Sequence, residues 1–225
     1  QLLYGEHFKV LDQRKKWSKI RNAFDNFEGW VSNQQFTLID EDLFKELESL
    51  ESTKVSSELI SFIETESNVL LPIVLGSCIP QNCPLNHKFD GSFTIGKQDK
   101  DQLVNKALLY LNAPYLWGGK TTFGIDGPGF TQMTYKTNGY RLLRGAQQQS
   151  TQGEALSFIE ESEPGDLAFF DNNDGTIDHV GIIMENNYII HSFGKVRIDR
   201  IDHTGIFNTE TNTYTHKLRV IKKII

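Results

Sequence analysis

The sequence has no excess of basic residues and no long apolar run, and each shortage excludes a class of protein. It has 23 Lys and Arg against 29 Asp and Glu, which gives a formal charge of -6. Without a positive surface to contact phosphates, nucleic acid is a poor partner. The longest apolar run covers residues 69–76 and contains Pro72. Because a bilayer requires roughly 20 apolar residues, no transmembrane segment is expected.

Cysteine is also scarce. Only Cys78 and Cys83 are present, and they stand five positions apart in a segment with two prolines. In an oxidising compartment they could form a small disulfide, and in a reducing one they would be two free thiols. Close spacing in sequence does not guarantee disulfide geometry, so both states stay open.

The chain does have enough apolar material for a folded core. Of its 225 residues, 38% are hydrophobic and 11% are aromatic, which is typical of a globular protein and not of a disordered one. This length fits one large domain or two small ones. The pattern changes near residue 98, which predicts a boundary between a region 1–98 and a domain 99–225.

Short alternating runs separated by turn residues predict a small β-barrel in region 1–98. The clearest runs are residues 17–21 (WSKIR) and 27–31 (FEGWV), and they resemble bacterial SH3-like domains. Apolar residues at helical spacing over 43–50 predict a helix behind Asp40 as its N-cap. Residues 59–63 are too short a run to assign to strand or helix. One SH3-like unit or two would fit this region.

The second region predicts helices first and strands afterwards. One helix is expected near residues 100–111, because Pro114 enforces its end. Another is expected from Pro128 to about Asn138, with Gly127 as its N-cap, Pro128 in the first turn and Gly139 as a stop signal. Strands are then expected over residues 167–170, 180–184, 188–191 and 196–198. Helices followed by an antiparallel sheet make an α+β unit.

Five motifs stand in order along this second region. They are residues 114–120 (PYLWGGK), 123–130 (FGIDGPGF), 164–170 (PGDLAFF), 178–182 (DHVGI) and 189–192 (IIHS). Their order and spacing resemble the NlpC family of bacterial cell-wall cysteine endopeptidases, which cleave γ-D-glutamyl-diamino acid bonds of peptidoglycan. The resemblance implies a papain-like α+β domain, often preceded by an SH3-like domain, in an exported protein of the periplasm or cell envelope.

The resemblance also implies a cysteine at the position of Gly127, where the family usually reads Asp-Cys-Ser-Gly-Phe. A cysteine peptidase needs a thiolate, an imidazole to move its proton and a polar group that orients the imidazole. In the family, the thiol stands at a helix start, where the helix dipole lowers its pKa. His179 matches the general base and His191 the orienting residue. The enzyme is therefore predicted to be inactive as written.

The resemblance gives four candidate substrate-binding residues, of which Tyr115 and Trp117 match a cleft-lining motif. Asp126 and Arg144 complete the set. The family's Arg-Asp-Ser stretch, which helps to hold the amino end of the substrate, reads Arg144-Gly145-Ala146 here. Glycine and alanine cannot form that salt bridge or hydrogen bond. The cleft is still expected to accept a peptide or a peptidoglycan stem fragment without cutting it.

No cofactor is expected, and no metal site. A site made from His179, His191 and Asp178 is not favoured, because no further ligand stands at a recognised spacing. The remaining histidines match no motif and receive no role; they are His7, His87, His203 and His216. The chain opens with Gln1 and shows no signal-peptide pattern, so the leader of an exported protein is expected to have been removed or left out.

Three hypotheses about function follow. The leading one is a non-catalytic member of the family that binds peptide or peptidoglycan fragments. The second is an active cysteine endopeptidase, either with position 127 altered in this sequence or with another nucleophile, for which the candidates are Ser150, Thr151, Cys78 and Cys83. The third is an interaction protein that works through its SH3-like surface. Natural loss of the cysteine is favoured over engineering, because Pro128 and Gly145 also depart from the pattern. The sequence leaves the oligomeric state open.

Overall fold

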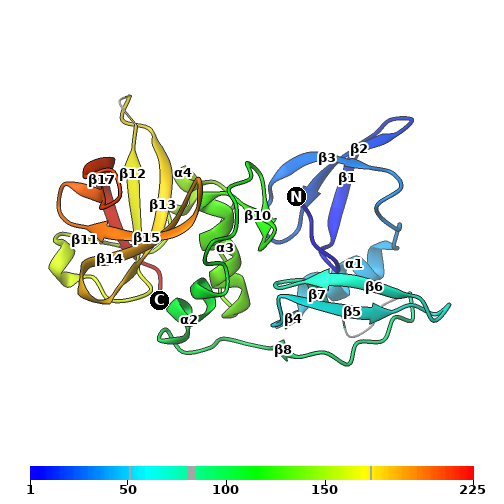
Figure 1. The fold of residues 1–225 in the computed structure, drawn as a ribbon. Coiled ribbons are helices and arrows are strands. Elements are labelled where there is room, and N and C mark those ends of the chain that lie inside the picture. The colour runs from blue at the N-terminus through cyan, green and yellow to red at the C-terminus, as the bar shows by residue number, and fades with distance from the viewer. Residues whose placement is uncertain (51, 81–84, 173) are drawn as a thin grey trace. The chain divides into compact units, whose positions relative to one another are not determined.

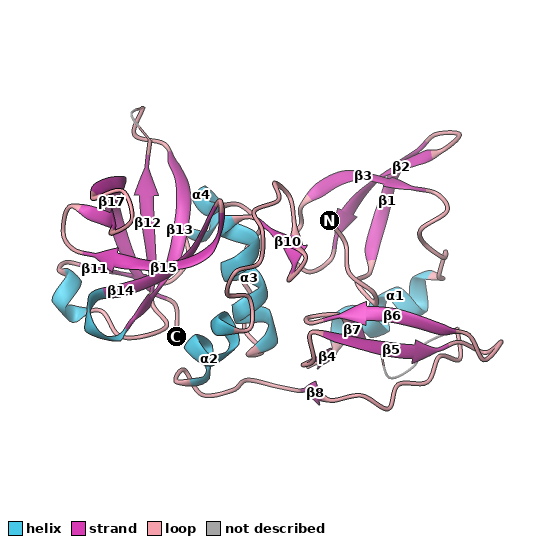
Figure 2. Cartoon of the chain, in the orientation of Figure 1, coloured by secondary structure: helices cyan, strands magenta, loops and turns pink. Residues whose placement is uncertain are grey.

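The chain divides into two compact units, drawn in Figures 1 and 2. The computed structural model describes residues 1–50, 52–80, 85–172 and 174–225. One unit is Leu2–Gly96, and the other is Lys97–Ile225 together with Gln1. A pairing of Cys78 with Cys83 lies outside the described residues, because Cys83 is not among them.

The first unit begins with a three-stranded antiparallel sheet in the order β1-β2-β3. Its strands are β1 (Phe8–Gln13), β2 (Trp17–Asn22) and β3 (Glu28–Ser32). Along β2, Ser18, Ile20 and Asn22 are buried, which is the period of two expected for a strand with one covered face. Helix α1 (Glu41–Ser49) follows, and the Asp40 carboxylate accepts a hydrogen bond from the Leu43 N–H at 2.8 Å. This is the predicted cap.

The rest of this unit consists of short strands around a small aliphatic core. The core contains Ile63, Ile73 and Ile79, with Tyr4 and Phe89 packed against it. The strands are β4 (Lys54–Ser56), β5 (Ile60–Glu64), β6 (Leu70–Val74), β7 (Cys78–Ile79) and β8 (Phe93–Thr94). The run that sequence alone left unassigned is therefore strand β5. The β-rich architecture confirms the predicted SH3-like barrel region.

The second unit begins with its helices. They are α2 (Gln102–Leu108), α3 (Gly127–Thr137) and the short α4 (Ala146–Gln149), with a hairpin of β9 (Lys120–Thr121) and β10 (Gly124–Ile125) ahead of α3. Helix α2 is shorter at both ends than predicted, since residues 100–101 and 109–111 form turns. Helix α3 packs against α2 and against the sheet strands β13 and β14. Nearly all of α3 is buried, so it is the central helix of the unit.

A seven-stranded antiparallel sheet completes the unit, in the order β11-β17-β12-β13-β14-β15-β16. Strand β17 pairs with β12 and also with β16, so the strands from β12 to β17 close on themselves. The elements are β11 (Glu154–Leu156), β12 (Leu167–Asp171), β13 (Ile177–Met184), β14 (Tyr188–Phe193), β15 (Lys195–Ile201), β16 (Gly205–Asn208), β17 (Thr213–Lys223) and the 3₁₀ turns η1 (Ile159–Glu161) and η2 (Glu185–Asn187).

Aliphatic and aromatic side chains fill the interior of this closed sheet. They include Ala168, Phe170, Ile183, Ile189 and Ile206, all buried. Helices followed by an antiparallel sheet confirm the predicted α+β papain-like class (Figure 2). Among the helices of the described residues, none is both long enough and apolar enough to cross a bilayer.

Candidate active site

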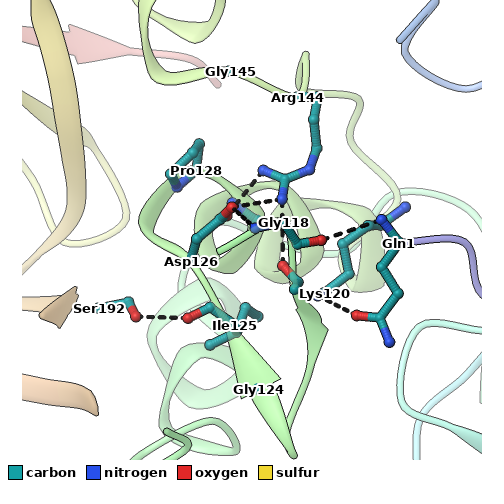
Figure 3. A network of polar contacts seen from close by, with 12 residues as sticks. Gln1, Gly118, Lys120, Gly124, Ile125, Asp126, Pro128, Arg144, Gly145 and Ser192 are labelled. Atoms are coloured by element: carbon teal, nitrogen blue, oxygen red, sulfur yellow. Dashed lines mark hydrogen bonds and ion pairs between the residues drawn. The ribbon is translucent and has the colours of Figure 1, made fainter. Parts of the chain in front are cut away.

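The start of helix α3 forms one wall of the candidate site. The Asp126 carboxylate caps the helix, accepting hydrogen bonds from the Gly129 N–H and the Gly118 N–H, both at 2.7 Å (Figure 3). Gly127 is consequently the first residue of the helix and not its N-cap, which corrects the expected start by one residue. Pro128 still costs no hydrogen bond, because the first four N–H groups of a helix have no intrahelical partner.

A buried ion pair fixes this helix start. Two nitrogens of the Arg144 guanidinium bind the two carboxylate oxygens of Asp126 at 2.9 and 2.7 Å (Figure 3). The residues are only 7% and 6% exposed. A β-carbon added at Gly129 would come within 2.4 Å of the Gly119 carbonyl oxygen, so this close approach requires glycine. Asp126 and Arg144 therefore make the contacts of a scaffold, and their role in binding substrate stays a prediction.

Gly127 faces His179 of strand β13. A β-carbon built on Gly127 would lie 3.5 Å from His179 Nδ1 and 3.6 Å from the Val180 carbonyl oxygen. These are ordinary van der Waals distances, so a side chain has room at position 127. The structure thus brings together the position of the absent thiol and the imidazole that matches the base.

His179 belongs to a chain of hydrogen bonds that runs across three neighbouring strands. His179 Nε2 lies 2.9 Å from Nδ1 of His191 on β14, and His191 Nε2 lies 3.0 Å from a carboxylate oxygen of Asp199 on β15. Arg197 donates to both oxygens of that carboxylate, at 2.7 Å to the oxygen that His191 contacts and at 3.0 Å to the other. Asp199 and Arg197 are not predicted from the sequence, because no motif marks them and only the β14–β15 register brings them beside His191.

These contacts set the tautomers of both rings. Burial acts to raise the pKa of Asp199, but hydrogen bonds from His191 and Arg197 outweigh it and the pKa is lowered. An ionised carboxylate only accepts, so His191 carries its proton on Nε2. Nδ1 of His191 must then accept a hydrogen bond from the Nε2–H of His179. The unprotonated Nδ1 of His179 is left facing Gly127, as a base for a thiol at that position would be.

A third histidine lies against this pair. The ring of His216 on β17 stacks on the His179 ring at 4.0 Å between centroids, with 23° between the planes. It meets the His191 ring edge-on at 5.7 Å. The sequence analysis gave His216 no role. It arrives at the site because β17 lies beside β12, which is itself the neighbour of β13, and no local pattern reports such a pairing.

All three imidazoles resist protonation. Burial, and then the proximity of His216 and His191, holds the pKa of His179 well below its usual 6.5. Burial and the nearby His191 lower the pKa of His216 to about 4. The pKa of His191 is also lowered by burial, although Asp199 opposes the effect. At neutral pH, the cluster therefore consists of uncharged rings, each with one unprotonated nitrogen.

A groove of about 710 Å³ opens over this cluster. Tyr115, His179 and His216 line it, together with the acidic side chains of Asp171 and Asp178. Tyr115 is half-exposed, as a residue in contact with a ligand would be. Trp117 is 85% exposed and does not line this groove, so the structure separates the two aromatic residues that the sequence analysis placed together.

Two family models match the chain. The NlpC/P60 family matches residues 112–215, and the bacterial dipeptidyl-peptidase Sh3 domain matches residues 1–36. The probable endopeptidase NlpC of Escherichia coli is 32% identical over 127 residues, an alignment that covers 55% of this chain and 79% of that protein. The chain belongs to the NlpC/P60 family. The resemblance noted from the five motifs is thereby confirmed.

Similarity to other NlpC/P60 proteins extends over both units. The gamma-D-glutamyl-L-lysine dipeptidyl-peptidase of Bacillus cereus is 29% identical over 222 residues, covering 85% of this chain and 66% of that protein, so the chain spans slightly less than two thirds of its length. The Bacillus subtilis protein of the same name is 23% identical over 216 residues, an alignment that covers 85% of this chain and 71% of that protein. A crystal structure of an NlpC/P60 family protein from Bacillus cereus has a TM-score of 0.81, covers 100% of this chain and 81% of that one, and is 21% identical. It shares the fold.

Proposed function

We propose that this NlpC/P60 protein is non-catalytic and binds peptide or peptidoglycan stem fragments in the groove over His179. The observation that carries the proposal is the bare helix start at Gly127, 3.5 Å from His179 Nδ1 when measured from an added β-carbon. An imidazole can activate a thiol but does not replace it as the nucleophile in this chemistry. The groove remains, and the attacking atom does not.

The hydroxyl groups that could replace the thiol support the proposal, because their protons are directed elsewhere. Ser192 lines the groove but donates to the Ile125 carbonyl oxygen at 2.9 Å (Figure 3). Ser150 and Thr151 donate to backbone carbonyl oxygens of helix α4 at 2.8 and 2.7 Å. Within the described residues, the hydrogen bond of the His179 ring goes to His191. Thr215 also lines the groove, but its hydroxyl contacts His216 Nδ1 at 2.8 Å and not His179. Among the described residues, none of these four hydroxyls is thus hydrogen-bonded to the imidazole that faces position 127.

An active endopeptidase is the second candidate, and two observations favour it. The chain from His179 through His191 to Asp199 is complete, and the relatives that align with both units are named as peptidases. In this hypothesis position 127 carries a cysteine in the natural protein. Both hypotheses place the protein in the bacterial cell envelope, where stem peptides occur.

Binding and cleavage of one peptide separate the two candidates. The probe is L-Ala-γ-D-Glu-L-Lys, with calorimetry for binding and mass spectrometry for hydrolysis, in buffer with a metal chelator. We expect binding without hydrolysis. Tyr115→Ala should weaken binding roughly threefold to tenfold, the worth of one aromatic contact. Phe123→Ala is the matched control, because Phe123 is an exposed aromatic residue outside the groove lining.

Two results would overturn the proposal. Hydrolysis that a thiol-alkylating reagent abolishes would establish the endopeptidase. Absence of binding, or equal loss of binding in Tyr115→Ala and Phe123→Ala, would remove the groove as a peptide site.

A further inference from the structure

We propose that His179, His191 and His216 form a binding site for one divalent transition-metal ion, of which Zn²⁺ is the representative. One nitrogen from each ring lies within 4.8 Å of the others. Imidazole is a preferred ligand of zinc, copper and nickel. The inference goes beyond the proposed peptide binding and does not rest on it.

The distances between the ring nitrogens fit an ion after a small adjustment. A tetrahedral Zn²⁺ with Zn–N bonds of about 2.0–2.1 Å needs ligand nitrogens roughly 3.3–3.4 Å apart. His179 Nε2 and His191 Nδ1 are 2.9 Å apart, so this pair has to separate slightly. Bringing in the His216 nitrogen requires a movement of about 1.4 Å at most, given the 4.8 Å limit. The His216 ring also has to tilt out of its stack on His179, because the lone pairs of two stacked rings lie side by side and do not converge on one ion. His216 is only partly buried and lines the groove, so its outer face is not held by packing.

His191 and His216 each use one ring nitrogen for a hydrogen bond to a neighbouring side chain, as metal-binding histidines do. His191 donates its Nε2 proton to Asp199, which leaves Nδ1 as a lone pair directed at His179. A carboxylate behind a histidine ligand fixes its tautomer and raises its basicity. Nδ1 of His216 lies 2.8 Å from the Thr215 hydroxyl, so its Nε2 is the nitrogen free to bind. For His179, moving its proton from Nε2 to Nδ1, on the side of Gly127, frees Nε2.

Charge and access also suit a metal ion. The three rings are neutral at pH 7, because burial lowers the pKa of each, and neutral imidazole is the form that binds metal. His179 and His216 line the groove, which gives an ion a path from solvent. Three protein ligands leave a fourth position for water or for an oxygen of a bound molecule.

A base and its orienting partner require only His179 and His191, and His216 is surplus to that pair. As a packing residue, it places a third imidazole against two others, where burial and a neighbouring ring lower its pKa to about 4. A phenylalanine at this position would supply the stacked ring without burying a titratable group. Coordination of an ion makes use of the property in which histidine differs from phenylalanine, namely its ring nitrogen.

The test is a zinc titration of the whole chain by calorimetry, without peptide, after treatment with a chelator and its removal. Co²⁺ absorption provides a second measurement, because tetrahedral and octahedral cobalt differ in intensity. We expect one equivalent of Zn²⁺ to bind. His216→Phe keeps the stacked ring and removes the nitrogen, so affinity should fall at least 100-fold, the upper end of what the loss of an outer partner costs. Should this variant not fold, His216→Gln serves in its place.

His203→Phe is the matched control, because His203 is an exposed histidine of the same unit outside the cluster. It should bind zinc as the unmodified chain does. Absence of stoichiometric binding, or a His216→Phe protein that binds zinc unchanged, would overturn the proposal. A chain that binds zinc and not the stem peptide would refute the proposed function alone, and the reverse result would refute the metal site alone.

Discussion

Replacing Gly127 with cysteine tests whether the helix start retains the setting of a nucleophile. The nearest atom to the added β-carbon is His179 Nδ1 at 3.5 Å, so the substitution brings no steric clash. The new thiol would stand at the N-terminus of α3, and the lone pair of His179 Nδ1 would face it. Both features favour the thiolate.

The expected gain in reactivity follows from the thiolate fraction. A free thiol has a pKa of about 8.5, whereas thiols at helix N-termini, or paired with a histidine that takes up their proton, fall to about 3.5–7.5. For a pKa of about 6.5, the thiolate fraction at pH 5.5 rises from about 0.1% to about 9%, roughly 90-fold. Nucleophilicity falls with pKa at a coefficient of about 0.4–0.5, which removes roughly eightfold. Alkylation should therefore be roughly tenfold faster than for an unperturbed thiol.

The assay follows iodoacetamide labelling at pH 5.5 by peptide mapping, which separates the new thiol from Cys78. The reference is the same variant unfolded in urea. A double variant, Gly127→Cys with His179→Phe, separates the imidazole from the helix dipole and should lose part of the gain. Labelling of the folded protein at the rate of the unfolded chain would refute the assignment of this helix start as the nucleophile position.

Reactivity should not bring efficient peptidase activity, because a second function is expected to be missing at Gly145 and Ala146. Loss of a charged partner in a cleft costs about 2–5 kcal/mol, or roughly 30-fold to 5,000-fold in rate. Efficient cleavage should require Gly127→Cys with Pro128→Ser, Gly145→Asp and Ala146→Ser. An aspartate fits at Gly145, where the nearest atom to an added β-carbon is the flexible end of Gln148 at 3.2 Å. Equal kcat/KM for the single and quadruple variants would contradict this.

Two further predictions concern stability. Asp126→Ala leaves buried Arg144 unpaired and uncaps α3, so the free energy of unfolding in urea should fall by about 3–5 kcal/mol; a loss below about 1 kcal/mol would contradict the scaffold role. The lowered pKa values of His179, His191 and His216 mean that the unfolded chain takes up protons below about pH 6.5 that the folded chain refuses. The free energy of unfolding should therefore be highest above that pH and fall as pH decreases toward the His216 pKa of about 4. The His216→Phe variant should show a smaller fall. A free energy of unfolding that rises from pH 6.5 to pH 5 would refute this prediction.

The sequence predicted the elements whose signals are local. The cap at Asp40, the central helix after Pro128 and the alternating strands of the second unit are all present. Periodicity could not assign β5, because five residues are compatible with either structure. The start of α3 was placed one residue late, because Pro128 was predicted as the first helical residue and Gly127 as the N-cap, whereas the Asp126 carboxylate is the cap.

The parts of the site that sequence missed depend on pairing between distant strands. Asp199 meets His191 only through the register of β14 with β15, and His216 meets His179 only because β17 inserts beside β12. Strand β17 also has irregular registers with both β12 and β16. Alternation counted along its sequence therefore does not tell which side chains enter the cluster. A metal site was not favoured because no further ligand stands at a recognised spacing, and it is strand pairing that brings His216 beside the other two histidines.

Two sets of residues at this site have different physical explanations. Folding alone accounts for three of these residues. Asp126 caps α3, Arg144 forms the ion pair with it, and Gly129 allows a close approach of the backbone at Gly119. The histidine cluster is different, since keeping three buried imidazoles neutral reduces stability in acid. A bound metal ion would offset that cost, because an ion that binds only the folded state stabilises it. The histidine cluster is thus best explained by the proposed metal site, and the cap and ion pair at the start of α3 are explained by folding.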